Sequence, residues 1–205
     1  MDVSNKTLVK NRLVVADREE TLFQEAKLDG KNKVFLNLEC GNKILTGFKN
    51  IDKDFLDSKI YNCEIFEIPV EAESVDVIYC AHTYEAFSED KGLQALSEWS
   101  RVLKVNGRCF LEIPDIEEIA FRILDSTVPE KEKNLYYNIL FGTSSQELFF
   151  NKKTQKAIDP TKLFKFGFSK EKLRDVLTKL DFSIQEMFTF DGWGIPSIWV
   201  RFNKV

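Results

Sequence analysis

The chain of 205 residues has little histidine and little glycine: one histidine and nine glycines. Its single histidine, His82, excludes every metal site that needs two or more imidazoles, and a histidine-based catalytic triad would have to use it. Nine glycines leave few places where the backbone can approach a phosphate or a cofactor closely. We therefore expect no bound metal.

The four cysteines, at positions 40, 63, 80 and 109, are dispersed along the chain. They form no C-x-x-C pair, so the sequence encodes neither a zinc site nor a dithiol redox motif. Cys63, Cys80 and Cys109 lie in or beside apolar runs, which is typical of buried free thiols. Reduced thiols fit the cytoplasm.

Long apolar runs are also missing. No segment approaches the length of a membrane span, and residues 1–15 lack a signal-peptide core and cleavage site. A net charge of −4 argues against nonspecific nucleic-acid binding, although a local basic patch remains possible. We therefore expect a cytoplasmic protein with neither a membrane nor a nucleic acid as partner, and its oligomeric state is open.

The composition is that of a soluble globular protein, with 43% hydrophobic and 30% charged residues. Its 18 phenylalanines supply large rings for a core. The length predicts a single domain over residues 1–205. Residues 115–168 are less regular, and we interpret them as a helical insertion or lid with helices expected at 116–124 and 131–141.

Short apolar runs alternate with amphipathic segments along the rest of the chain. The runs predict strands at residues 33–38, 47–51, 65–68, 74–81 and 108–113, and a closing antiparallel hairpin of strands at 182–190 and 195–202. The amphipathic segments predict helices at residues 17–28, 88–103 and 169–180. Short strands separated by helices indicate an α/β fold around a parallel sheet whose faces are both covered.

Two loops that end predicted strands carry a resemblance to a known family. Residues 36–42 read L-N-L-E-C-G-N, and residues 47–52 read G-F-K-N-I-D. They resemble the opening of class I S-adenosylmethionine-dependent methyltransferases, and are closest to a small subgroup with L-N-L-G-C-G in the first loop and G-W-x-N-x-D at the end of the second strand.

Further motifs follow in the family's order between about residues 33 and 190. Residues 74–87 read S-V-D-V-I-Y-C-A-H-T-Y-E-A-F, which is similar to the family stretch that ends L-E-H-F. Residues 95–108 and 113–115 resemble A-L-x-E-x-x-R-V-L-K-P-G-G-R and V-P-D, and G-F-type elements follow near 167 and 181. The resemblance implies a doubly wound, Rossmann-like, mostly parallel seven-stranded sheet with an antiparallel C-terminal hairpin and helices on both faces.

The resemblance also implies a cofactor site outside the carboxyl ends of the strands, where such sheets bind ligands. Its cofactor is S-adenosylmethionine, and the implied contacts are Asn37, Leu38, Glu39, Cys40, Gly41, Asp52, Glu64, Ala81 and His82. Asp52 would accept both ribose hydroxyls, unless it only caps its strand. Glu64 would lie near the adenine, although that alignment is loose and a surface role is equally open.

The resemblance implies that the loop after the fourth predicted strand lines both the cofactor pocket and the substrate pocket. His82 and Glu85 are its candidates for proton handling and hence for catalytic residues. A lone histidine is often structural, so both interpretations of His82 stay open. Glu98 and Arg101, three residues apart on a predicted helix, are interpreted as a surface or interface ion pair.

Val105-Asn106 replaces Pro-Gly of the family pattern, which the backbone tolerates, and three further departures fall on the presumed pocket side. Glu39 stands where the first loop has glycine, Ala86 replaces the histidine of L-E-H-F, and Phe164 stands where a histidine often precedes K-F-G-F. A glutamate in the first loop adds bulk and a negative charge near the cofactor's carboxylate, unless it points outward or pairs with the cofactor's ammonium group. Two like charges about 4 Å apart cost about 1 kcal/mol in water and several times more in a semi-buried site.

Three functions are consistent with these features to different degrees. The leading hypothesis is methyl transfer from S-adenosylmethionine to a small-molecule or glycan-like acceptor, by in-line displacement and mainly through proximity and orientation. The alternative is a catalytically inactive, methyltransferase-like binding or assembly protein, which the three departures suggest. A nucleotide-dependent oxidoreductase fits less well, because the chain lacks G-x-G-x-x-G.

Overall fold

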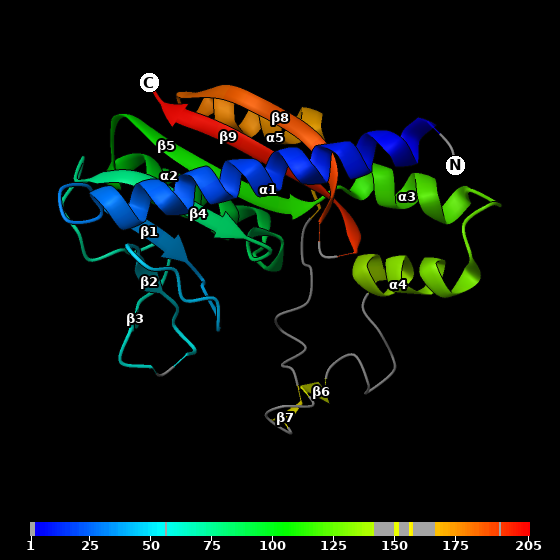
Figure 1. Cartoon of the computed structure of the whole chain (residues 1–205), viewed down its shortest axis with the longest axis horizontal. Helices are drawn as coiled ribbons and strands as arrows, with labels where there is room; N and C mark the ends of the chain where they lie inside the picture. Colours follow the sequence, from blue (N-terminus) through cyan, green and yellow to red (C-terminus); the bar gives the residue numbers. More distant parts are fainter. Residues whose placement is uncertain (1–2, 56, 142–149, 152–155, 158–166, 193) are drawn as a thin grey trace.

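The central feature of the protein is a seven-stranded sheet, seen in a computed structural model that describes residues 3–55, 57–141, 150–151, 156–157, 167–192 and 194–205 (Figure 1). Its strands are β1 Phe35–Leu38, β2 Lys49–Ile51, β3 Ile60–Tyr61, β4 Val75–Ala81, β5 Leu103–Pro114, β8 Phe182–Gly192 and β9 Ile195–Lys204. Their order across the sheet is β3-β2-β1-β4-β5-β9-β8. Neighbours from β3 to β5 pair in parallel, whereas β9 runs antiparallel to β5 and β8. The predicted mostly parallel sheet with a C-terminal antiparallel hairpin is confirmed.

Helices cover both faces of this sheet (Figure 1). Helix α1 (Val3–Asp29) lies across one face, and α2 (Glu89–Val102) and α5 (Lys170–Lys179) pack on the other. The remaining elements are the 3-10 turn η1 (Tyr84–Ala86), helices α3 (Ile116–Leu124) and α4 (Glu130–Phe141), and the short antiparallel pair β6 (Phe150–Asn151) and β7 (Lys156–Ala157). Among the helices of the described ranges, none has the length and apolarity that a membrane crossing requires.

The strands divide their side chains between two hydrophobic cores. On β4, Ile78 and Cys80 belong to the core beneath α2 and α5, whereas Val77 and Tyr79 belong to the core beneath α1. This alternation follows from the two-residue period of a strand. Cys80 is a buried free thiol, as predicted, but Cys63 is only half-buried because it lies in the irregular segment after β3.

The first helix is longer than the sequence pattern indicates. A start at residue 17 was wrong, because α1 already begins at Val3. Its early part is tied to the sheet by tertiary contacts: Val15 is buried, and the Asn11 side-chain amide donates to the carbonyl oxygen of Thr189 on β8 at 2.6 Å. Packing therefore stabilises turns that the apolar periodicity alone does not predict.

The third strand is Ile60–Tyr61, and the prediction of a strand at 65–68 was wrong. Residues 65–68 form a turn, although Ile65 and Ile68 are buried. The pattern misled because burial is shared by strands and buried turns. A strand and a buried turn differ in the hydrogen-bond partners of their backbone groups: a strand bonds to a neighbouring strand, whereas this turn bonds to side chains of α2.

Side chains of α2 satisfy the backbone of this buried turn. The Trp99 indole Nε1–H donates to the carbonyl oxygen of Ile65 at 3.1 Å. The Glu98 carboxylate accepts from the Ile68 amide at 2.8 Å, and Arg101 donates to the Ile68 carbonyl at 3.0 Å. Glu98 and Arg101 are thus not a simple surface pair: their carboxylate–guanidinium contact of 2.7 Å also anchors the turn to α2.

Gly47 lets the end of α1 approach the loop before β2. Its φ is +87°, and a Cβ at this position would lie 2.3 Å from the carbonyl oxygen of Ala26. A side chain at residue 47 would therefore be both strained and in collision with helix backbone. The close approach brings α1 against the sheet edge that carries β1 and β2.

Helices α3 and α4 confirm the helices expected at the start of the 115–168 segment. Residues 142–149, 152–155 and 158–166 of that segment lie outside the described residues. They form a small core of their own from Ile119, Tyr136 and Ile139. This pair follows the carboxyl end of β5, which is also the end of the sheet where the loops after β1 and β4 lie (Figure 1).

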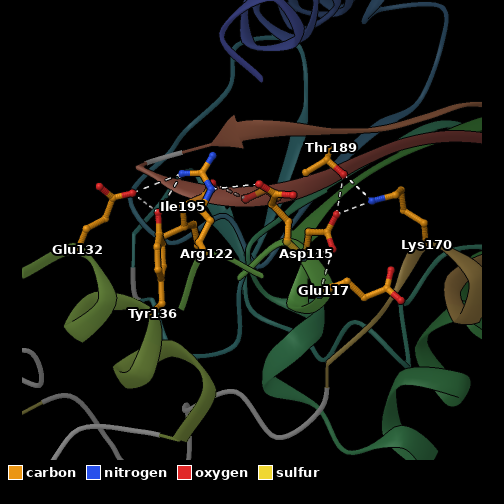
Figure 2. Close-up of polar contacts among 10 residues, drawn as sticks. Asp115, Glu117, Arg122, Glu132, Tyr136, Lys170, Thr189 and Ile195 are labelled. Carbon is orange, nitrogen blue, oxygen red and sulfur yellow. Dashed lines mark hydrogen bonds and ion pairs between the residues drawn. The ribbon is translucent and has the colours of Figure 1, made fainter. Parts of the chain in front are cut away.

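A buried acid at the end of β5 ties α3 to the rest of the fold (Figure 2). Asp115 is fully buried, and its Oδ1 accepts from the backbone amides of Glu117 and Glu118 at 3.2 Å, which caps α3. Its Oδ2 accepts from the Lys170 ammonium at 2.6 Å and from the Thr189 hydroxyl at 2.5 Å. One carboxylate therefore joins the starts of α3 and α5 to β8.

Arg122 performs the same task between α3 and α4 (Figure 2). Its guanidinium donates to Glu118 within α3 at 3.1 Å and to the Tyr136 hydroxyl of α4 at 2.9 Å. A longer contact of 3.4 Å reaches Glu132. The pair α3–α4 is thus held as one unit beside the loops that form the candidate site.

Candidate active site

A cavity of about 420 Å³ opens at the carboxyl ends of β1 and β4. Its described lining residues are Asn37, Leu38, Glu39, Cys40, Asn42, Lys43, Tyr79, Ala81, His82, Glu85, Ala86 and Ile195. Six of the nine expected cofactor contacts and both expected catalytic residues are among them. Gly41, Asp52 and Glu64 are not among the lining residues in the described ranges.

The turn after β1 is held by a buried amide pair. The Asn37 side-chain amide donates to Asn50 Oδ1 and to the carbonyl oxygen of Lys43, both at 2.8 Å. Asn50 Oδ1 also accepts from the backbone amide of Leu45 at 2.9 Å. Asn37 therefore shapes the cavity by fixing the 40–45 loop against β2.

Asp52 holds the same turn through its carboxylate. Its Oδ2 accepts from the Gly41 amide at 2.8 Å, and its Oδ1 accepts from the amides of Asp54 and Phe55 at 2.8 Å and 3.1 Å. A carboxylate has about four acceptor positions, so most of the capacity of this buried group is already used. In this structure Asp52 acts first as a clamp between the two cofactor-side loops.

Glu39 adopts a left-handed backbone conformation with φ +48°, which suits the glycine of the family pattern and disfavours a glutamate. Its Oε1 is buried and has no hydrogen-bond partner among the described residues. Burial raises the pKa of Glu39 to about 7; Asp52, Asp54 and Glu64 add to the rise, and Lys53 opposes it. The side chain therefore does not point outward into solvent.

Glu64 is paired with a lysine. The Lys53 ammonium lies 3.1 Å from Glu64 Oε1, and both side chains are partly exposed. Its second oxygen, Oε2, is buried without a hydrogen-bond partner in the described parts of the chain. The expected adenine-side acid thus lies near Glu39 at the edge of the site rather than in the cavity wall.

His82 lies between two buried carboxyl groups. Its Nε2 is 3.0 Å from Glu112 Oε1, and its Nδ1 is 3.8 Å from Glu85 Oε1. Burial alone would lower the pKa of His82, but the hydrogen bond to Glu112 and the charges of Glu112 and Glu85 outweigh it and raise the pKa. Burial raises the pKa of Glu85 to about 7. This group can exchange a proton near neutral pH.

Sequence reasoning missed Glu112, although a signal was present. Glu112 is the one charged residue in the apolar run 109–113 of β5, and such a residue is rarely buried without a partner. Parallel pairing sets Glu112 beside Ala81, and the His82 amide donates to the Glu112 carbonyl oxygen at 2.9 Å. The strand register thus brings together residues that are 30 positions apart.

Lys43 and Tyr79 were missed as well. The Lys43 ammonium donates to the Tyr79 hydroxyl at 2.9 Å, and that hydroxyl donates to Glu19 of α1. Lys43 also lies 3.6 Å from Glu19. No pattern in the sequence marks Glu19 as a neighbour of this cavity, because only the packing of α1 on the sheet places it there.

The Glu112–His82 contact depends on Gly192 of β8. A Cβ at residue 192 would lie 2.8 Å from Glu112 Oε1, the oxygen that faces His82. We expect Gly192→Ala and Glu112→Gln both to lower the pKa of His82 by removing a contact that raises it. Because the chain has one histidine, its NMR signal reports this pKa without ambiguity. Glu117→Gln, an exposed acid on α3, should leave the pKa unchanged; an equal pKa in all four proteins would contradict the coupling.

The strand order and the position of the cavity define the Rossmann-like fold of class I S-adenosylmethionine-dependent methyltransferases. Residues 12–111 match the family model described as methyltransferase domain, just under half of the chain. No curated protein sequence matches this chain. Phe164, one of the three departures from the family pattern, lies outside the described residues, whereas Glu39 and Ala86 line the cavity.

Solved structures with the same fold include three methyltransferases. A SAM-dependent methyltransferase from Methanosarcina mazei is 14% identical, with a TM-score of 0.54 over 83% of this chain and 92% of that one. Magnesium protoporphyrin IX methyltransferase from Synechocystis PCC 6803, solved with bound SAM, is 10% identical, with a TM-score of 0.51 over 95% and 81%. Geranyl diphosphate C-methyltransferase from Streptomyces coelicolor A3(2), solved with Mg²⁺, geranyl diphosphate and S-adenosyl-L-homocysteine, is 10% identical, with a TM-score of 0.52 over 92% and 80%. At these identities the similarity establishes the fold.

Proposed function

We propose that this chain transfers a methyl group from S-adenosylmethionine to a small-molecule or glycan-like acceptor. The observation that carries the proposal is the cavity at the ends of β1 and β4, whose walls are the residues that resemble the family's cofactor loops. The match of residues 12–111 to the methyltransferase domain supports it. Fold neighbours solved with SAM or its product, which act on geranyl diphosphate and magnesium protoporphyrin IX, support both the cofactor and a small acceptor.

The cofactor contacts we assign follow from the cavity and from the resemblance together. The end of β1 and the turn after it, residues 37–41, would meet the amino-acid end, and Ala81 with His82 would form the facing wall. Asp52 would use its remaining acceptor capacity for the ribose, and Glu64 would border the adenine. The first-loop and L-E-H-F-like motifs also lead us to place the chain near the small L-N-L-G-C-G subgroup.

When bound, S-adenosylmethionine supplies a methyl group activated by a positively charged sulfur. The chain's own residues would align the acceptor with that methyl group, since proximity and orientation account for much of such a rate enhancement. If the acceptor is a hydroxyl or an amine, His82 and Glu85 would remove its proton, because both line the cavity and burial raises the pKa of Glu85 to about 7. We further propose that the chain is a single domain and that its 115–168 segment, a helical insertion or lid, contributes to acceptor choice.

A second candidate function is a methyltransferase-like binding protein without catalysis. Two observations favour it: Asp52 already accepts three backbone N–H groups, and Glu39 places a carboxyl group in the cofactor turn. Both features would weaken cofactor binding if the loop kept its present shape. Under this alternative the protein binds neither S-adenosylmethionine nor its product at millimolar concentration.

Calorimetric titration with S-adenosylhomocysteine tests the cofactor site. We expect binding by the natural chain, and a loss of at least about tenfold, or about 1.4 kcal/mol, in Ala86→Trp, because the indole would occupy the cavity. The matched control is Ala120→Trp on the exposed face of α3, which should bind normally. Equal affinity in both variants would show that the cofactor binds elsewhere, and no binding by the natural chain would reject the proposed function.

A further inference from the structure

We propose that the cavity selects its ligand by charge: the carboxyl groups of Glu39 and Glu85 favour the positively charged methyl donor over the neutral product. This inference rests on the proposed function. It names two specificity-determining residues, one of which stands where the family has glycine.

The first observation is a pair of buried carboxyl oxygens that lack partners. Glu39 Oε1 and Glu85 Oε2 are both buried without a hydrogen-bond partner in the described ranges, and both residues line the same cavity. An unsatisfied buried acceptor costs about 1–3 kcal/mol, and more when it is charged. A cation bound in the cavity that both residues line would offset part of this cost by its charge.

The second observation is the backbone of Glu39. A left-handed conformation costs a non-glycine residue about 1–2 kcal/mol, so this side chain occupies the turn at the expense of both strain and desolvation. Backbone strain that a structure maintains at one residue supports a functional hypothesis for that residue, here Glu39. Lys43, a cation in the cavity lining, is paired within the protein: its ammonium contacts the Tyr79 hydroxyl at 2.9 Å and Glu19 of α1 at 3.6 Å.

The charge change of the reaction gives this selection a consequence. S-adenosylmethionine carries a sulfonium, an ammonium and a carboxylate, for a net charge of about +1. When the methyl carbon bonds to the acceptor, the electron pair of the broken carbon–sulfur bond stays on sulfur, and the acceptor loses its proton. The product is a neutral thioether with no net charge, so the two carboxyl groups lose an attraction that the donor had.

The protonation of Glu39 and Glu85 makes the selection depend on pH. Glu39 faces Asp52, Asp54 and Glu64, which hold its proton, and Lys53, which opposes them; Glu85 faces His82 and Glu112. A bound cation favours the ionised carboxylate, so donor binding below about pH 7 releases protons. Preference for the cationic ligand should therefore rise as the pH increases through about 7 and then level off.

The test compares two unreactive ligands by calorimetry: sinefungin, which has a cationic amine in place of the sulfonium, and S-adenosylhomocysteine. Their ammonium and carboxylate groups are shared, so the ratio of their Kd values isolates the extra charge. We expect sinefungin to bind the natural chain at least about tenfold more tightly at pH near 8, and less so at pH near 6. Glu39→Gln and Glu85→Gln should each reduce the ratio, and the double variant should bring it to about 1–3.

Two further variants keep the outcome clear. Glu39→Gly restores the family's residue, and we expect it to reduce the ratio even if it tightens both ligands by relieving strain. Glu117→Gln removes an exposed acid outside the cavity and should leave the ratio unchanged. A ratio that does not fall in the Glu39 and Glu85 variants would overturn the inference while leaving the proposed function intact, whereas failure of both ligands to bind would overturn both.

Discussion

Replacing Asp115 with alanine is expected to lower the free energy of unfolding by about 3 kcal/mol. The carboxylate is fully buried and accepts four hydrogen bonds, two from the start of α3 and two from Lys170 and Thr189. Loss of a helix cap costs about 1 kcal/mol, and breaking a buried charged pair costs about 3–5 kcal/mol. The sum is reduced here, because the Lys170 side chain is 37% exposed and can turn to solvent.

Urea unfolding followed by circular dichroism measures this loss. Asp115→Asn is the informative companion, since it keeps an oxygen for the α3 cap but removes the charge that faces Lys170, and it should fall between the natural chain and alanine. Glu117→Ala, in the first turn of the same helix and exposed, is the control and should cost less than about 0.5 kcal/mol. A loss below about 1 kcal/mol in Asp115→Ala would show that this cluster does not hold α3 in place.

Replacing His82 with asparagine is expected to lower methyl transfer about 10²–10⁴-fold near neutral pH, provided that the acceptor must lose a proton. Asparagine is the suitable replacement, because residue 82 has φ +53° and asparagine tolerates the left-handed region. Removing the imidazole also leaves Glu85 and Glu112 without the group that lies between them. Turnover is measured as S-adenosylhomocysteine release, and calorimetry checks that cofactor affinity changes by less than about tenfold.

A double variant distinguishes joint action of His82 and Glu85 in proton transfer from a loss of activity through misfolding. If the two act as a unit, the double variant with Glu85→Gln should lose about as much activity as either single variant. The pH profile should also change, since the pair titrates as one system and its pKa values belong to both groups. Unchanged turnover in His82→Asn would show that the acceptor reacts without help from this pair.

The candidate site consists of a few polar groups that apolar strands and helices hold in place. Asn37 and Asp52 fix the turn after β1, and Glu112 orients His82 at the end of β4. Each of these contacts joins loops or strands that are adjacent only in the sheet. Their geometry is therefore set by strand pairing, and substitutions in the strands beneath should alter the site as readily as substitutions in its walls.

Local features of the sequence were sufficient for much of the fold. The Ser169 hydroxyl accepts from the Lys172 amide and begins α5 where the cap signal predicted it. The hairpin of β8 and β9, the apolar strands β1, β4 and β5, and helix α2 follow from periodicity over a few residues. These elements were predictable because their signals lie within the element itself.

The tertiary structure alone decided the rest. Residues 65–68 are apolar enough for a strand, yet they form a turn because Trp99, Glu98 and Arg101 satisfy its backbone from another helix. Glu39 could have pointed to solvent, and only the packing of the loops buries one of its oxygens.

Scarcity of glycine and histidine marked where the chain departs from the family that it resembles, since both residue types can be counted in the sequence. What those departures do depends on contacts between residues far apart in the chain: His82 is paired with Glu112 because β4 and β5 lie side by side in one register. Local signals determine elements, because they need only neighbours along the chain. The burial of a side chain, its pKa and its hydrogen-bond partners are set by the assembled sheet, so they are defined only once the sheet has formed.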